Sequence, residues 1–267
     1  MADGTKGTEE AKAGGTAGQR SVGEQRGVAL GHDFNEQRYG RVRPNAAESS
    51  DDRVTLMMRL VQRIRDQGAN SILDVGCTDG FLSQKFRDMG LYTIGIDASA
   101  SAVETARAKT DEAYVADTGK EALPIPNDTV ELVWAGEIIE HIFDTEFFIE
   151  ELLRVTKPGG RLILSTPNLG AWINRIALLL GTQPFFTEVG VRQSNQGSFL
   201  RKVTTPAGHI RNFTQSSLKD LLQRCGWTVE STHGAALLTG KSVLWLDKIV
   251  SHALPSLATD LVFVCRK

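Results

Sequence analysis

The stretch SILDVGCTDGFLS, residues 71–83, decides the fold. It begins as a short apolar run that predicts a buried strand, turns at two glycines, and continues as the start of a helix. Short apolar runs and helical segments then alternate up to residue 168. Because parallel strands need helical crossovers, this alternation predicts an α/β fold with a parallel sheet covered by helices on both faces.

Other segments set the expected boundaries. The first residues are rich in Gly, Ala, Thr and Glu and bury too little apolar surface to become ordered. Residues 169–211 interrupt the alternation with an apolar helix-like run and a long irregular segment, as lids and binding elements do. We therefore expect a disordered tail at 1–27, a helical segment at 28–70, a ligand-binding core at 71–168, a cap insertion at 169–211, and the C-terminal part of the sheet at 212–267.

The composition excludes several classes of protein. The 267 residues carry a formal net charge of −2, with a pI near 6.2, which argues against a general nucleic-acid or anionic-membrane binder and leaves only local basic clusters for such contacts. Three cysteines without paired spacing give neither a disulfide framework nor a zinc site. Because no signal peptide and no run of about 18 apolar residues is visible, we expect a cytoplasmic protein without a transmembrane segment.

Residues that the glycine turn lacks exclude two common kinds of phosphate-binding site and so narrow the choice of ligand. A dinucleotide fingerprint needs glycines where this chain has Thr78 and Phe81, and no Gly-Lys-Ser/Thr follows to make a P-loop. Asp74, near the end of the strand, would repel a pyrophosphate but suits a ligand with positive charge. S-adenosylmethionine carries an ammonium and a sulfonium, and Gly76 and Gly80 would let the backbone approach its amino-acid part.

Two further acids stand at the ends of the next expected strands. Asp97 ends YTIGID and can accept hydrogen bonds from both hydroxyls of a ribose, and Asp117 ends AYVAD and can accept from an adenine amino group. Taken singly, an Asp before a helix is also a common N-cap. Three acids at three consecutive strand ends favour a ligand site.

The segments ILDVGCTDGFLS, IGIDAS, VADT, VELVWAGEIIEHIFD and LLRVTKPGGRLILSTPN together resemble the class I S-adenosylmethionine-dependent methyltransferases, in particular the small-molecule branch with the ubiquinone-pathway O-methyltransferases. The resemblance implies a Rossmann-like, seven-stranded, mostly parallel sheet whose last strand is antiparallel. It also implies three sets of cofactor contacts: Asp74, Gly76, Cys77 and Gly80 around the methionine part, Asp97 with Ala98 at the ribose, and Asp117 with Thr118 beside the adenine. Thr78 departs from the glycine that is commoner in the family.

The segment GEIIEHIFD carries the candidates for acceptor chemistry. Glu137, Glu140 and His141 would share one face of a helical turn, and two carboxylates with an imidazole could bind Mg²⁺ or Mn²⁺. Such an ion would lower the pKa of an acceptor hydroxyl beside the methyl donor. The resemblance to the metal-using ubiquinone-pathway enzymes and small-RNA 2′-O-methyltransferases adds His209 as a fourth ligand.

A second interpretation leaves the metal out. Glu137 then contacts the cofactor, Glu140 and His141 cap or pack the start of a helix, and His141 acts at most as a general base. Of these residues, we assign the catalytic roles to His141 and Glu140. Four aromatic residues of the insertion could line an apolar acceptor pocket or form a small core of the cap: Trp172, Phe185, Phe186 and Phe199.

The expected function is methyl transfer from S-adenosylmethionine to a small-molecule acceptor, at a hydroxyl oxygen, in quinone or specialised metabolism. One alternative is an RNA 2′-O-methyltransferase, which the Glu-x-x-Glu-His set favours and the acidic pI opposes. Two others are an N-methyltransferase of a small molecule and a cofactor-binding regulatory protein without catalysis. The sequence leaves the acceptor and the oligomeric state open.

Overall fold

The computed structural model describes residues 52–190, 196–197, 207–237 and 241–267, with only the backbone described at 241–244. The expected tail at 1–27 and Phe199 lie outside the described residues. Along the chain the elements are α2 (Asp52–Asp66), β1 (Ser71–Val75), α3 (Phe81–Asp88), β2 (Tyr92–Asp97), α4 (Ala100–Ala106), β3 (Glu112–Val115), β4 (Val130–Gly136), a 3₁₀ turn η2 (Ile139–His141), α5 (Thr145–Val155), β5 (Thr156–Pro167), α6 (Trp172–Leu179), α7 (Gln215–Arg224), β6 (Thr228–Ala235), α8 (Lys241–Ala253), a 3₁₀ turn η3 (Pro255–Leu257) and β7 (Asp260–Arg266).

Several helices begin at side-chain caps that the sequence supplies. Ser99 and Asp144 each accept a hydrogen bond from the N–H three residues further on, at the starts of α4 and α5. Thr214 and Ser217 bond each other's backbone N–H at the start of α7. Each cap satisfies N–H groups that the first turn of a helix otherwise leaves without a partner.

The seven strands form one sheet in the order β3-β2-β1-β4-β5-β7-β6. Neighbouring strands are parallel, except that β7 is antiparallel to both β5 and β6. The predicted seven-stranded sheet with an antiparallel last strand is confirmed. The chain order reverses between β1 and β4, and α/β sheets bind ligands beyond the carboxyl ends of the strands at such a point.

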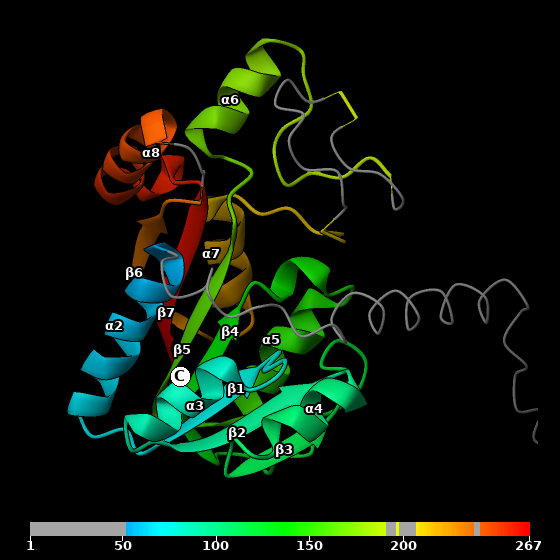
Figure 1. Ribbon diagram of the computed structural model, residues 1–267, viewed down its shortest axis with the longest axis vertical. Coiled ribbons are helices and arrows are strands. Elements are labelled where there is room, and N and C mark those ends of the chain that lie inside the picture. Colours follow the sequence, from blue (N-terminus) through cyan, green and yellow to red (C-terminus); the bar gives the residue numbers. More distant parts are fainter. Residues whose placement is uncertain (1–51, 191–195, 198–206, 238–240) are drawn as a thin grey trace, which may run out of the picture.

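Helices cover both faces of the sheet (Figure 1). Helices α2 and α3 pack on one face through buried side chains that include Met57 and Phe86. On the other face, α5 and α7 contribute Phe148 and Leu218 to a second cluster. Each such side chain stabilises the fold by about 1.5–3 kcal/mol through burial, so both faces serve stability and the carboxyl edge remains for function.

Strand β5 begins earlier than the sequence predicts. The pattern indicates a turn at 157–160 followed by a strand, whereas Thr156 already pairs with Val130 and pairing resumes with Arg161 opposite Leu132. The four residues between form a bulge. A Cβ on Gly160 would lie 2.7 Å from the Thr156 side chain, so this bulge needs glycine.

Helix α6 follows β5 and lies at the same end of the molecule as α8 (Figure 1). Trp172 Nε1 donates a hydrogen bond to Asp247 Oδ1 at 2.9 Å and so joins the two helices. Among the described residues, no helix has the length and apolar character needed to cross a bilayer.

Candidate functional site

The β1–α3 turn folds back onto the end of β2. The N–H groups of Gly76 and Cys77 both donate to the carbonyl of Ile96, at 2.8 and 2.9 Å. Gly76 and Gly80 have φ values of 74° and 76°, which glycine adopts without strain. Thr78 also has a positive φ, 48°, so the turn keeps a left-handed residue at the position that departs from glycine.

The two glycines also have a packing role. A Cβ on Gly80 would lie 3.0 Å from the Cα of Ala106 in α4, and one on Gly76 would lie 3.2 Å from the Ile138 side chain. The sequence predicts glycine here so that a ligand can approach the backbone. The structure adds a second reason, because α4 lies directly against the turn.

The acids of β1 and β2 are both buried, with Asp74 2% and Asp97 8% exposed. Asp74 accepts a hydrogen bond from Ser83 Oγ at 2.5 Å. Asp97 accepts from the backbone N–H groups of Thr78, at 3.0 Å, and Ser99, at 2.9 Å. Asp97 therefore ties the end of β2 to the glycine turn, and its role as a ribose ligand stays a prediction.

The residues predicted beside the ribose and adenine lie at the same edge because β1, β2 and β3 are parallel neighbours. Ala98 is half-buried and Thr118 is buried. Asp117 is more exposed and forms an ion pair with Lys120 Nζ at 2.5 Å. These contacts are compatible with the predicted cofactor roles and leave them as predictions.

Cys77 is a packing residue of the turn. It is 3% exposed, and a Cβ on Gly95 would lie 3.0 Å from its sulfur. Burial, and after it the charges of Asp74 and Asp97, raise the pKa of the Cys77 thiol well above its usual range. The thiol is therefore neutral at physiological pH and is no nucleophile.

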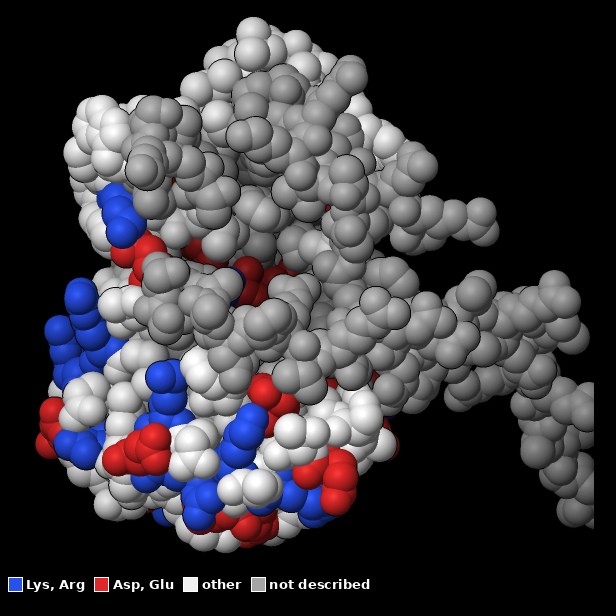
Figure 2. Space-filling model, in the orientation of Figure 1, with Lys and Arg blue, Asp and Glu red and all other residues white. Residues whose placement is uncertain are grey.

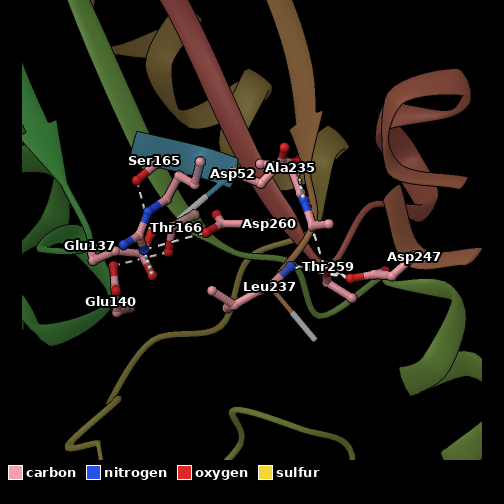
Figure 3. A network of polar contacts seen from close by, with 12 residues as sticks. Asp52, Glu137, Glu140, Ser165, Thr166, Ala235, Leu237, Asp247, Thr259 and Asp260 are labelled. Atoms are coloured by element: carbon pink, nitrogen blue, oxygen red, sulfur yellow. Dashed lines mark hydrogen bonds and ion pairs between the residues drawn. The ribbon is translucent and has the colours of Figure 1, made fainter. Parts of the chain in front are cut away.

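Glu137 follows β4 and belongs to a network of charges (Figure 3). Its carboxylate accepts from Ser165 Oγ at 2.9 Å and pairs with Arg53 at 2.7 Å, and Arg53 also lies 3.5 Å from Asp260. The backbone of Glu137 has a φ of 55°, a strained value for a residue with a side chain. The strain directs Glu137 toward α2 and β5 rather than along the turn that carries Glu140.

Glu140 is a deeply buried acid of this region, with 1% exposure. Thr166 Oγ1 donates to its Oε2 at 3.0 Å, while Oε1 has no hydrogen-bond partner among the described residues. Burial, and after it the charge of Glu137, raises the pKa of the Glu140 carboxyl well above its usual range. The Glu140 carbonyl also accepts from the N–H groups of Ile210 and Arg211, which brings the end of the insertion beside η2.

The two predicted histidines meet at this point. His141 Nδ1 donates to the carbonyl of Gly208 at 3.0 Å, and His209 Nδ1 donates to that of Phe186 at 2.9 Å. Because a carbonyl only accepts, each ring carries a proton on Nδ1, and the neutral form of each ring therefore has its lone pair on Nε2. The ring centroids lie 5.0 Å apart, and His141 Nε2 lies 3.9 Å from Glu140 Oε1.

Glu140, His141 and His209 each offer one ligand atom, and these atoms lie within 4.8 Å of one another. Glu137 is not part of this group, because Arg53 and Ser165 hold its carboxylate. The structure therefore brings together three of the four predicted metal ligands.

Other residues that build the site were missed at the sequence level. Glu188 accepts from the N–H groups of Ala207 and Gly208 and so holds the backbone next to His209. Arg53 and Asp260 come from opposite ends of the described chain and carry no local signal. Thr166 did carry a local signal, since it stands at the end of a predicted strand.

The surface over this region is hollowed. In the space-filling view, acidic atoms lie deep between the lower half of the molecule and the half with α6 and α8 (Figure 2). In the network of Figure 3, Glu137 after β4 and Asp260 of β7 both pair with Arg53.

Residues 73–164 match the family model described as a methyltransferase domain. A probable S-adenosylmethionine-dependent methyltransferase of Mycolicibacterium smegmatis is 29% identical over 170 residues, which cover 62% of this chain and 56% of that protein. The chain carries an S-adenosylmethionine-dependent methyltransferase domain. The match includes the turn, the strand-end acids and η2, whereas His209 lies beyond it.

Two further comparisons agree with this domain. A ubiquinone biosynthesis O-methyltransferase of Chelativorans is 30% identical over 174 residues, which cover 62% of each chain. This chain thus spans between half and two thirds of the length of these curated relatives. The crystal structure of a SAM-dependent methyltransferase of Archaeoglobus fulgidus shares the fold, with a TM-score of 0.54 at 14% identity, and the match covers 88% of this chain and 98% of that one.

Proposed function

We propose that the chain transfers the methyl group of S-adenosylmethionine to a hydroxyl oxygen of a small-molecule acceptor, with a divalent metal ion at Glu140, His141 and His209. One observation carries the proposal: two side chains of η2 and one from the end of the insertion place ligand atoms within 4.8 Å of one another at the edge of a methyltransferase sheet. A relative named as an O-methyltransferase supports oxygen as the acceptor atom.

The side chains fit a metal ion. Glu140 Oε1 is a buried carboxylate oxygen without a hydrogen-bond partner among the described residues, and such an atom is costly to bury without a positive charge beside it. Both histidines donate Nδ1–H to a backbone carbonyl, as metal-binding histidines commonly do with their second nitrogen. Two imidazoles and one carboxylate suit Mn²⁺, Zn²⁺ or Fe²⁺ better than Mg²⁺, which prefers oxygen ligands.

The residues of the chain have separate roles in this reaction. Asp74 and Asp97 orient the methyl donor, while Thr166 and the backbone bonds at 210–211 hold Glu140 in place. A divalent ion supplies positive charge that lowers the pKa of an acceptor hydroxyl. The acceptor oxygen bonds to the methyl carbon as the carbon–sulfur bond breaks, and the electron pair returns to sulfur. The hydroxyl proton goes to solvent, or to His141 Nε2 if no ion is bound.

Metal binding can be measured without any acceptor. We expect titration calorimetry on metal-stripped protein to show one Mn²⁺ or Zn²⁺ site, weakened about tenfold or more by His209→Ala. His252→Ala is the matched control, because His252 is a half-exposed histidine that pairs with Asp52 and is not one of the three proposed ligands. Equal metal affinity in both variants would contradict the assignment of the ligands.

Turnover tests the rest of the proposal. Methyl-labelled S-adenosylmethionine is incubated with a panel of catechols, phenols and matched amines, with and without EDTA. We expect label in the hydroxyl compounds only, and a loss of transfer in EDTA that added Mn²⁺ or Zn²⁺ restores. Full activity of metal-stripped protein in EDTA would eliminate the metal and leave His141 as the base. Transfer to amines alone would replace oxygen by nitrogen as the acceptor atom.

A further inference from the structure

In the part of helix α8 whose side chains are described, residues 245–253, two polar side chains face the protein, and large apolar side chains face solvent beside the exposed Lys248 and His252. Asp247 and Ser251 are fully buried, whereas Trp245 is 59% and Ile249 56% exposed. The Asp247 carboxylate accepts hydrogen bonds from Trp172, Thr259 and the backbone N–H of Leu237. This is the reverse of a surface helix of a globular protein, whose apolar face packs on the core.

Helix α6 shows part of this pattern. Asn174 is 1% exposed and bonds the backbone of Asn168 and Phe185 on the inner side, where Ile173 and Ala177 are also buried. Leu178, at 59%, and Leu179, at 86%, face outward. Two neighbouring helices that both expose large apolar side chains are not explained by single exposed side chains, which are common on protein surfaces.

The outward apolar side chains gather at one end of the molecule. We call Leu178, Leu179, Leu180, Trp245, Ile249 and Leu254 the apolar end. In the space-filling view, charged side chains crowd the opposite half, and the described surface over α6 and the top of α8 is almost without them (Figure 2). The ribbon shows both helices beyond the carboxyl edge of the sheet (Figure 1).

The exposed charged side chains described on α6 and α8 are basic, and Asp52 of α2, whose side chain is 17% exposed, lies 4.0 Å from Lys248 Nζ. The sequence of α6 contains one charged residue, Arg175, which is exposed. The only acid in the sequence of α8 is Asp247, which is buried, and its exposed charged side chain is Lys248. An apolar surface with a tryptophan and basic side chains at its margin suits the boundary between acyl chains and anionic headgroups.

We propose that the apolar end docks on the surface of a bilayer that contains anionic lipid. The outward leucines and Trp245 enter the acyl boundary, and Arg175 and Lys248 meet the headgroups. A second copy of the chain fits less well, because a two-fold interface through this end would bring two sets of basic side chains together while offering no acid from either helix. The contact is peripheral, and it is compatible with an acidic chain because it uses only local positive charge.

The experiment uses the full chain and vesicles of phosphatidylcholine with about one third phosphatidylglycerol, compared with phosphatidylcholine alone. We expect the chain to co-sediment with the anionic vesicles and to bind the neutral ones about tenfold less well. Trp134 and Trp227 are buried, and Trp172 is half-buried, so Trp245 is the exposed reporter. Its fluorescence should shift to the blue on binding, and Trp245→Phe should abolish most of the shift.

Matched variants separate the contributions. Leu178→Ser with Leu179→Ser should weaken vesicle binding about tenfold or more, and Lys248→Gln about fivefold. Val115→Ser is the control, since Val115 is 50% exposed at the opposite end of the molecule. It should bind as the unchanged chain does.

Three outcomes would overturn the proposal. The first is the absence of co-sedimentation with either vesicle. The second is a concentration-dependent dimer, seen by analytical ultracentrifugation, that the double leucine variant abolishes, because a second copy would then cover the apolar end. The third is a lower unfolding midpoint of the double variant without any change in vesicle binding, because the chain itself would then cover it.

Discussion

The cofactor half and the acceptor half of the site lie at one edge of the same sheet but are built in different ways. In the cofactor half, the turn after β1 and the acids after β2 and β3 bond mainly to residues close to them in sequence or on the next strand. In the acceptor half, η2 is held by β5 and by the last residues of the insertion, and Glu137 beside it is held by α2. A site that is built from local contacts can be predicted from the sequence. A site that is built from long-range contacts can change when the surrounding chain changes.

The acceptor half should be the more sensitive to a single side chain. Replacing Glu140 by Gln keeps the shape of the side chain but removes the charge that faces the two histidines. We expect transfer to fall on the order of 10³-fold, about 4 kcal/mol, because the residue serves the transition state. Cofactor affinity measured by calorimetry should change less than about twofold.

The control for this variant is Glu104→Gln, an exposed acid on α4. It should leave both transfer and cofactor affinity unchanged. A Glu140→Gln protein with normal turnover would show that η2 serves packing alone. A variant that loses cofactor affinity instead would place Glu140 in the cofactor half.

In the glycine turn, by contrast, we expect substitutions to lower the stability of the fold. Gly80→Ala combines a positive φ with a Cβ 3.0 Å from the backbone of Ala106, and we expect unfolding free energy to fall by about 2–4 kcal/mol in urea titrations. Gly90 has a similar φ, 85°, and open space around a Cβ. Gly90→Ala should therefore cost about 1 kcal/mol, from strain alone. Equal costs would mean that the close approach of α4 is unimportant.

The same difference explains what the sequence could and could not predict. The strand-end acids follow from the strand period and from the rule that parallel strands end at one edge, so Asp97 and Asp117 could be placed without coordinates. His209 was reached only through resemblance. Arg53 pairs with Asp260 across 207 residues, and no pattern of spacing encodes such a contact. The outward apolar faces of α6 and α8 were likewise hidden, because a helix-like apolar pattern does not reveal which side faces solvent.

Asp97 tests how much the cofactor half depends on one acid. With Asp97→Ala we expect S-adenosylmethionine affinity to fall more than tenfold, since two hydrogen bonds to a carboxylate contribute about 1.5–3 kcal/mol each. Asp117→Ala should lose less, because Asp117 is partly exposed and already pairs with Lys120. Calorimetry of S-adenosylmethionine binding to both variants shows which of them loses more affinity. A larger loss for Asp117 would reverse the assignment of ribose and adenine contacts.

The smallest effect concerns a long-range contact on the cofactor side. Glu151 on α5 accepts from the N–H of Leu123 at 2.8 Å and pairs with Arg154, which also bonds the carbonyls of Leu123 and Ile125. These bonds fix the segment that follows Asp117. The hydrogen bond from Arg154, against an opposing effect of burial, lowers the pKa of the Glu151 carboxyl from its usual value of 4.5.

Because the folded-state pKa of Glu151 is lowered, the stabilisation that this carboxylate provides is present above its unfolded pKa and is lost as the pH falls through the folded pKa. Glu151→Gln should therefore destabilise the protein by about 1–2 kcal/mol at pH 7, as hydrogen bonds to a charged group weaken. The difference from the unchanged chain should shrink as the pH falls below 4.5. Urea titrations of both proteins across this range measure it. A difference that stays constant with pH would show that Glu151 acts through packing rather than charge, and the cofactor half would then depend on local contacts throughout.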